Sequence, residues 1–259
     1  MNIDLTGKKV LIIGASKGLG EHLAYVLAQY NCVIFLVARN EEKLSKIWEN
    51  LRNDGKECFY SPLDLLLDGS VSTLYTQLIK ENFIPDIVIH NLGGALGKKD
   101  PFDNRQSFLE VWNFNVGIQI EINNRIIPHM ISNKWGRIIS ISSILSKNGG
   151  MPLIPYGGSI QYNAAKAYLN SYNKSLSREL APFDIVVSTV LPGVLFSEGK
   201  YWSKLVLSNP KLVDEFLETH VSTHRFGKYE EVSPFILLLC SEFASYCSGL
   251  EVNIDGGWK

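Results

Sequence analysis

Seven short apolar segments, spaced along the whole chain, constrain its fold more than any other feature. They lie at 9–14, 32–38, 58–64, 86–91, 136–142, 184–192 and 250–255, and 58–64 is the weakest of them. The segments are rich in Val and Ile and lack a strict alternation of polar and apolar residues. This pattern is typical of parallel strands that are buried on both faces of a sheet.

Helical patterns separate these segments. They cover roughly 18–30, 41–53, 70–82, 105–133, 162–180 and 229–243. The alternation of strand and helix predicts an α/β fold of the doubly wound, Rossmann type, with a parallel seven-stranded sheet and helices on both faces. No linker or low-complexity tract divides the chain, so we expect a single domain over 1–259.

The segment 193–225 departs from this alternation. It carries scattered aromatic residues and one weak helical period. It is also long for a connection between two elements, and long segments of this kind are often lids or binding loops. We therefore expect a substrate-binding lid here, within the same domain.

Charge and composition argue against several classes of partner. The net charge is −1, which gives no overall field to attract nucleic acid or an anionic membrane. The apolar run near the N-terminus, Val10–Ile13, stops at a glycine, and the run at 235–240 is too short to span a bilayer. The four cysteines (Cys32, Cys58, Cys240 and Cys247) form no CxxC pair. We expect free buried thiols in a cytoplasmic protein.

A glycine-rich turn joins the first predicted strand to the first predicted helix. In "VLIIGASKGLGEHLAYVLAQY" the glycines are Gly14, Gly18 and Gly20. Glycine permits a tight turn and lets backbone N–H groups approach a diphosphate, which the helix N-terminus then stabilises. A glycine triplet alone is weak evidence, but its place between strand and helix indicates a dinucleotide site.

The end of the second predicted strand indicates which dinucleotide binds. The residues Val37–Asn40 include no carboxylate, and the first one follows at Glu41. A carboxylate there would bind the ribose 2′-hydroxyl of NAD(H), whereas Arg39 can bind a 2′-phosphate. Lys17 would add positive charge and Ser16 a hydrogen-bond donor. The sequence therefore favours NADP(H) over NAD(H), and the alternative is that both cations are solvated surface charges.

Tyr162 and Lys166 are four residues apart on a helical pattern, so they adjoin on one helix face. An ammonium beside a phenol favours the phenolate and lowers the phenol pKa from its usual value of about 10. Tyr156 has Ile160 at the corresponding position, and the two glycines that follow it disfavour a helix. We expect Tyr156 in a loop, where it either lines the substrate pocket or only packs.

Together these motifs resemble the short-chain dehydrogenase/reductase family, and the overall pattern resembles its 3-oxoacyl-(acyl-carrier-protein) reductases. The turn is similar to the family's TGxxxGxG, with Ile13 in place of the threonine, and "NAAKA" after Tyr162 resembles its active-site helix. "LPGV" at 191–194 resembles the segment that passes over the nicotinamide. The threonine common a few residues later is missing, and Ser197 is the nearest hydroxyl. The resemblance covers 5–258, loosely between 193 and 225.

The resemblance implies a catalytic set of Ser143, Tyr162, Lys166 and Asn115. In "GRIISISSI", Ser143 matches the family's serine, Ser142 is the runner-up, and Ser140 stands at a usual asparagine. Asn115 matches the asparagine that holds a relay water. Cofactor contacts implied in the same way, or by the turn and strand ends above, are Gly14, Ser16, Lys17, Gly18, Leu19, Gly20, Arg39, Asp64, Leu65, Asn91, Gly93, Tyr162, Lys166, Pro192, Gly193 and Val194.

The expected reaction is hydride transfer between NADP(H) and a carbonyl or secondary alcohol. A 3-oxoacyl thioester, a ketone on a polar metabolite, and a non-catalytic dinucleotide-binding scaffold stay open as alternatives. The resemblance implies a homo-tetramer or homo-dimer, for which the apolar 229–250 region is a possible interface. The loop 144–161 is longer than usual, and His90 is expected to be structural. His220 and His224 have metal-ligand spacing but no evident third ligand, so we expect no metal.

Overall fold

Seven parallel strands form one sheet in the computed structural model, which describes residues 2–149, 159–199 and 201–259. The order across the sheet is β3-β2-β1-β4-β5-β6-β7. The strands are β1 (Lys9–Ile13), β2 (Val33–Ala38), β3 (Cys58–Pro62), β4 (Ile87–His90), β5 (Gly136–Ile141), β6 (Ile185–Pro192) and β7 (Glu251–Ile254). The predicted seven-stranded doubly wound sheet is therefore confirmed. Its strand order reverses between β1 and β4, which is where such sheets bind ligands.

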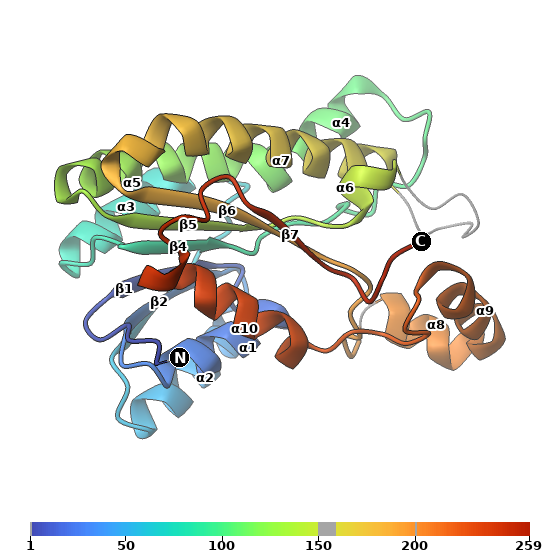
Figure 1. Cartoon of the computed structure of the whole chain (residues 1–259), viewed down its shortest axis with the longest axis horizontal. Helices are drawn as coiled ribbons and strands as arrows, with labels where there is room; N and C mark the ends of the chain where they lie inside the picture. The colour runs from blue at the N-terminus through green and yellow to red at the C-terminus, as the bar shows by residue number, and fades with distance from the viewer. Residues whose placement is uncertain (1, 150–158, 200) are drawn as a thin grey trace.

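Helices cover both faces of the sheet (Figure 1). The helices α1 (Leu19–Ala28), α2 (Glu41–Asn53) and α10 (Tyr229–Cys240) lie on one face. The other face carries α3 (Ser70–Lys80), α5 (Ile118–Asn133) and α7 (Ile160–Leu180). The short helices α4 (Arg105–Trp112) and α6 (Leu145–Asn148) lie near the start of α7. Among the residues described, no helix is both long and apolar enough to cross a membrane.

Strand β1 shows why apolar residues follow one another without alternation. Val10 and Ile12 belong to the core cluster that includes α1, α2 and α10, whereas Leu11 and Ile13 belong to the cluster under α3 and α5. All four side chains are fully buried. Each such burial stabilises the fold by about 1.5–3 kcal/mol. Because both faces of the strand are covered, neither set of alternate positions is polar.

The apolar 229–250 region, a possible subunit interface in the sequence, is partly used inside the chain. Five residues of α10, namely Val232, Ile236, Leu237, Leu239 and Cys240, are buried in the cluster shared with α1 and β1. Phe235, Phe243 and Tyr246 remain exposed. All four cysteines are free thiols as predicted; Cys247 is half-buried, and the other three are buried.

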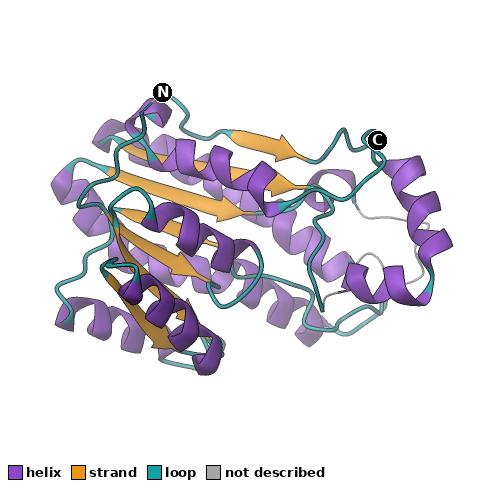
Figure 2. Ribbon diagram, turned by 90° about the horizontal axis from the view of Figure 1, so that it is seen from below, coloured by secondary structure: helices purple, strands orange, loops and turns teal. Residues whose placement is uncertain are grey.

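The segment 193–225 contains two helices, although the sequence indicated one weak helical period. They are α8 (Tyr201–Ser208) and α9 (Pro210–His220), and they project beyond the end of the sheet (Figure 2). Asn209 separates them and caps α9, because its side chain accepts a hydrogen bond from the Leu212 N–H at 3.2 Å. Trp202 of α8 stacks on Phe216 of α9, with ring centroids 4.7 Å apart. The aromatic residues therefore form the contact between the two helices.

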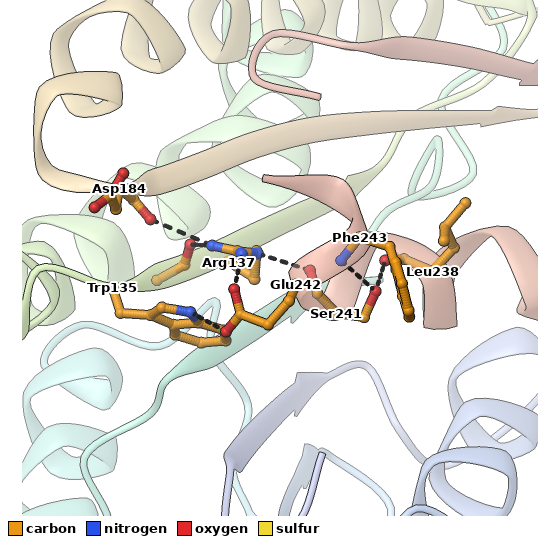
Figure 3. A network of polar contacts seen from close by, with 8 residues as sticks. Trp135, Arg137, Asp184, Leu238, Ser241, Glu242 and Phe243 are labelled. Atoms are coloured by element: carbon orange, nitrogen blue, oxygen red, sulfur yellow. Dashed lines mark hydrogen bonds and ion pairs between the residues drawn. The ribbon is translucent and has the colours of Figure 1, made fainter. Parts of the chain in front are cut away.

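At the opposite edge of the sheet, Arg137 joins three chain segments (Figure 3). Its guanidinium donates hydrogen bonds to the backbone oxygens of Ser241 and Asp184 at 3.3 and 3.2 Å. It also pairs with the Glu242 carboxylate at 3.4 Å and lies 4.4 Å from the centre of the Trp135 ring. The Arg137 side chain is fully buried, so these partners replace the water that it loses. The network ties the starts of β5 and β6 to the end of α10.

We predict that Arg137→Ala lowers the free energy of unfolding by about 3 kcal/mol or more, because it leaves buried carbonyls without donors. Glu242→Gln is the matched control, and we expect it to cost about 1 kcal/mol or less because the Glu242 side chain is mostly exposed. Urea unfolding followed by circular dichroism measures both values. Equal losses in the two variants would show that the ion pair, rather than the set of backbone bonds, holds this corner.

Candidate active site

A cavity of about 770 Å³ opens at the carboxyl ends of β1, β2 and β4. Its volume lies in the range typical of small-molecule and cofactor sites. Most residues expected to contact a dinucleotide line this one cavity: Gly14, Ser16, Lys17, Gly18, Leu19, Arg39, Asp64, Leu65, Asn91, Gly93 and Pro192. The strand reversal therefore brings together residues that lie up to 178 positions apart in the chain, from Gly14 to Pro192.

The three glycines of the turn have different roles. Gly14 and Gly18 line the cavity and have φ values of 85° and 63°, a region that favours glycine. Gly20, which was also expected to bind the cofactor, does not line the cavity. A Cβ at Gly20 would lie 2.6 Å from the Asn91 side-chain nitrogen, which donates a hydrogen bond to the Gly14 oxygen at 3.0 Å. Gly20 thus permits close packing of α1 against the turn.

The segment after β6 was expected to line the main cavity at Gly193 and Val194, but other residues of the segment do so. Gly193 and Val194 line a separate cavity of about 90 Å³, whereas Leu195 and Ser197 line the main one. Gly193 is required for another reason, because a Cβ there would lie 2.7 Å from the Asp255 Cα. The backbone beyond Pro192 therefore packs against the end of β7 before it turns toward the cavity.

Positive charge gathers where the second strand ends. Three cations line the cavity, namely Lys17, Arg39 and Lys43, against one acid, Asp64. Arg39 pairs with Asp64 at 3.5 Å, with side chains 58% and 31% exposed. An exposed pair of this kind contributes at most about 1 kcal/mol. Arg39 can consequently exchange Asp64 for a stronger anion such as a phosphate.

Three residues of the expected catalytic set come from β5 and α7. Ser143 lies close enough to Tyr162 to lower the pKa of its phenol. Lys166, one turn along α7, is buried and donates to the Ile141 oxygen at 2.8 Å, with its nitrogen 5.8 Å from the Tyr162 ring centre. Ser159 fixes the start of α7, since its hydroxyl accepts a hydrogen bond from the Tyr162 N–H at 3.2 Å. The capping residue Ser159, Tyr162 and Lys166 therefore follow one another along α7.

The fourth residue, Asn115, lies in a π-helical turn, Asn113–Gly117, that separates α4 from α5. The sequence predicted one continuous helix over 105–133, so the turn is a correction. Such turns are frequent at functional sites. The Asn115 side chain bonds both the N–H and the oxygen of Gly94, at 3.0 and 2.9 Å. A Cβ at Gly93 would lie 2.7 Å from the Asn115 oxygen and 2.8 Å from the Lys166 nitrogen, so both groups converge on Gly93.

The neighbouring serines point elsewhere. The Ser142 hydroxyl donates to the Asn170 side-chain oxygen at 2.6 Å, and the Ser140 hydroxyl accepts a bond from Gln119 at 2.6 Å. Both serines are buried. Among the three candidates, Ser143 is the one that influences the pKa of Tyr162. Its role in catalysis therefore stays a prediction.

Burial dominates the ionisation of the site. It raises the pKa of Tyr162, and the hydrogen bond from Ser143 offsets part of that rise. The lowering expected from Lys166 is not seen, because burial lowers the pKa of the lysine itself to about 7. His90 is buried as well, and its pKa falls to about 4. Its ring donates to the Asn123 side-chain oxygen at 2.9 Å, consistent with the expected structural role.

We predict that Lys166→Met stabilises the protein relative to wild type at pH 7 and that this gain disappears toward pH 10. The folded pKa of Lys166 is about 7 against an ordinary 10.5, so the unfolded chain binds the proton more tightly between these values. Wild-type stability then rises with pH across this window, by up to about 1.4 kcal/mol per pH unit.

Urea unfolding of both proteins at pH 7, 8, 9 and 10 tests this trend. Methionine matches the length of the lysine stem and has no proton to gain. The variant lacks the hydrogen bond to the Ile141 oxygen, and this lowers its free energy of unfolding by about 1 kcal/mol at every pH. The decisive result is therefore the change in the difference with pH, and a constant difference would contradict the prediction.

Two further expectations concern the histidines His220 and His224 and the loop that contains Tyr156. Within the described residues there is no cluster of three or more potential metal ligands, at His220 and His224 or elsewhere. His220 instead stacks on Phe216, with ring centroids 4.9 Å apart. Tyr156 and half of the long 144–161 loop, residues 150–158, lie outside the described residues.

Sequence reasoning missed several residues that line the cavity. They are Asn40, Lys43, Leu63, Leu92, Gly94, Leu96, Phe114, Ile141, Leu195 and Tyr229, together with Ile13, Val37 and Ala38 of the strands. Most adjoin a predicted residue, so the ends of the strands could have indicated them. Tyr229 is different, because it belongs to α10 and no motif near it indicates a ligand.

Known proteins similar to this chain match it over most or all of its length. The family model described as short chain dehydrogenase matches residues 8–200. The chain is 32% identical over 263 residues to a 3-oxoacyl-(acyl-carrier-protein) reductase of Rickettsia conorii, covering 98% of each. It is 29% identical over 261 residues to the Aquifex aeolicus reductase of the same name, covering 99% of each. L-sorbose reductase of Gluconobacter frateurii, solved with NADPH and L-sorbose, superposes with a TM-score of 0.89 at 24% identity, covering 99% of this chain and 98% of that one.

Proposed function

Because the chain belongs to the short-chain dehydrogenase/reductase family of oxidoreductases, we propose that it transfers a hydride between NADP(H) and a carbonyl or secondary alcohol. The observation that carries this proposal is the convergence of Asn115 and Lys166 on Gly93, which lines the large cavity, together with the pairing of Tyr162 and Lys166 on one face of α7. A scaffold that only binds dinucleotides has no use for this set.

The cavity fits a dinucleotide phosphate. The turn at Gly14 and Gly18 leads into the N-terminus of α1, which stabilises a diphosphate through backbone N–H groups. Arg39 and Lys43 would hold the 2′-phosphate, and Asp64 and Leu65 would contact the adenine. When bound, NADPH supplies the hydride, and the protein supplies position and charge.

In reduction, the Ser143 hydroxyl donates a hydrogen bond to the substrate carbonyl oxygen. The Tyr162 phenol gives its proton to that oxygen as negative charge develops on it. The raised pKa of Tyr162 suits this direction, because it keeps the phenol protonated at neutral pH. The Lys166 ammonium would hold the nicotinamide ribose and, together with the charge of NADP+, would favour the phenolate in oxidation. Asn115 positions the water from which the proton is replaced.

The substrate side is bounded by α8 and α9, which we propose as the lid of the 193–225 segment. Leu145, two residues after Ser143, packs in one apolar cluster with Tyr201, Trp202 and Val213. An apolar wall this close to Ser143 suits an acyl chain, and similarity to the acyl-carrier-protein reductases supports a 3-oxoacyl thioester as the specific substrate. The similarity to L-sorbose reductase leaves a polar ketone as the alternative. We propose a cytoplasmic homo-oligomer within a single domain.

We predict that Tyr162→Phe abolishes turnover but leaves NADPH affinity within a few-fold, because only the proton donor is lost. NADPH oxidation with a panel of ketones and 3-oxoacyl thioesters measures turnover, and fluorescence titration measures binding. Tyr156→Phe is the matched loss of a hydroxyl and is expected to be far milder. Near-wild-type turnover in Tyr162→Phe would overturn the assignment.

The serines provide a second comparison within the same assay. Ser143→Ala should reduce kcat by about 100-fold or more, a typical loss for a donor to a developing oxyanion. Ser142→Ala should retain most of the wild-type activity, because the Ser142 hydroxyl bonds Asn170. The reverse order of losses would move the carbonyl contact to Ser142.

We predict that Arg39→Ala weakens NADPH binding by about tenfold to a hundredfold and leaves NADH binding within a few-fold. The loss is that of a charge-assisted bond to the 2′-phosphate, which NADH lacks. Arg52→Ala, which removes an arginine of α2 away from the cavity, is the control. A wild-type preference for NADH would refute this reading of Arg39.

A further inference from the structure

The two ends of the lid excursion are pinned together beside the cofactor cavity. Leu195, after β6, pairs with Gly227, before α10. The Gly227 N–H donates to the Val194 oxygen at 3.0 Å, and the Phe196 N–H donates to the Gly227 oxygen at 3.1 Å. We call 194–197 and 227–229 the neck. The chain between the two parts of the neck carries α8 and α9, and it also contacts the C-terminal segment, where Val221 pairs with Trp258.

A hydrogen bond between the hydroxyls of Ser197 and Tyr229 ends the neck. Both residues are half-buried and line the main cavity together with Lys17, Gly18 and Leu19. A Cβ at Gly18 would lie 3.1 Å from the Tyr229 hydroxyl oxygen. The phenol therefore rests on the glycine turn itself, at the place where the fold would bind the diphosphate of a dinucleotide.

Neighbouring groups hold Tyr229 in this position. It is the first residue of α10, and the Glu231 carboxylate caps that helix by accepting the Lys228 N–H at 2.9 Å. Arg225 fixes the same carboxylate with bonds of 2.8 and 2.6 Å. On the other side, the His22 ring of α1 lies 6.0 Å from the Tyr229 ring. These contacts hold the start of the helix that carries the phenol.

The chemistry of the pair leaves one donor for a ligand. Two hydroxyls carry two hydrogens, and the bond between them uses one. The accepting hydroxyl keeps its own hydrogen, and both residues line the cavity. A diphosphate offers only acceptor oxygens and carries negative charge, so it matches a free hydroxyl donor next to backbone N–H groups.

We propose that Tyr229 and Ser197 form a hydroxyl latch that binds the cofactor diphosphate and slows cofactor release. The inference rests on the proposed dinucleotide-binding function and adds Tyr229 as a cofactor-positioning residue contributed by α10. The latch joins the glycine turn to the neck, so the bound diphosphate would bridge the two sides of the cleft.

The test compares NADPH dissociation rates in Tyr229→Phe, Ser197→Ala and the double variant, measured by stopped-flow fluorescence. Tyr229→Phe keeps the ring and its packing on His22 while removing the hydroxyl. We expect NADPH to dissociate about tenfold to a hundredfold faster, the effect of one hydrogen bond to a charged group. Because the two hydroxyls act as one unit, the double variant should be less affected than the product of the two single effects.

Two controls identify the group that the latch binds. Adenosine 2′-phosphate, which lacks the diphosphate, should compete for the site equally well in wild type and Tyr229→Phe. Tyr25→Phe removes a phenol that bonds Asn50 outside the cavity and should leave the dissociation rate unchanged. Thermal unfolding without cofactor checks that each variant is folded.

The outcomes separate this proposal from the one on which it rests. If wild type binds NADPH but Tyr229→Phe releases it at the wild-type rate, the latch is overturned and the reductase proposal stands. Equal weakening of adenosine 2′-phosphate would also overturn it, because the phenol would then act elsewhere in the cavity. Absence of any binding of NADPH or NADH to wild type would overturn both.

Discussion

The parallel direction of all seven strands is the constraint on which the rest of the structure depends. It places every strand's carboxyl end at one edge of the sheet, so Gly14, Asn91, Ser143 and Pro192 come together from four separate strand ends. Parallel pairing also requires a crossover between strands, and the crossover helices cover both faces. A buried sheet and a site at its carboxyl edge are therefore two results of the same geometry.

A network of polar contacts holds the opposite edge of the sheet. There, the buried Arg137 satisfies backbone oxygens from three segments, and its neighbours leave few polar groups without partners. At the functional edge, burial has the reverse effect. Lys166 is enclosed with only one bonded oxygen in the described structure, so its ammonium is costly and its pKa falls. The rest of the fold must offset the cost of burying such a group.

The sequence predicted the fold and most of the cavity because both depend on local signals. Unbroken Val and Ile runs identified the strands, and glycine spacing identified the turn. Periodicity did not detect the π-helical turn at Asn113–Gly117, since one inserted residue shifts a helical pattern too little to break it. The sequence did not predict two helices in 193–225. Residues of α8 and α9 pack in a cluster of their own, so their apolar spacing does not follow the main core.

The sequence did not predict that Tyr229 lines the cavity, and the reason lies in the tertiary contacts of the chain. Its neighbours in sequence make it the first residue of a core helix, and nothing in that local pattern involves a ligand. Its place at the cavity arises from the pairing of Leu195 with Gly227, a contact between segments that no local motif specifies. The same pairing fixes both ends of the excursion that carries α8 and α9. Because the Tyr229 phenol lies against Gly18, this pairing also joins the segment that carries α8 and α9 to the glycine turn.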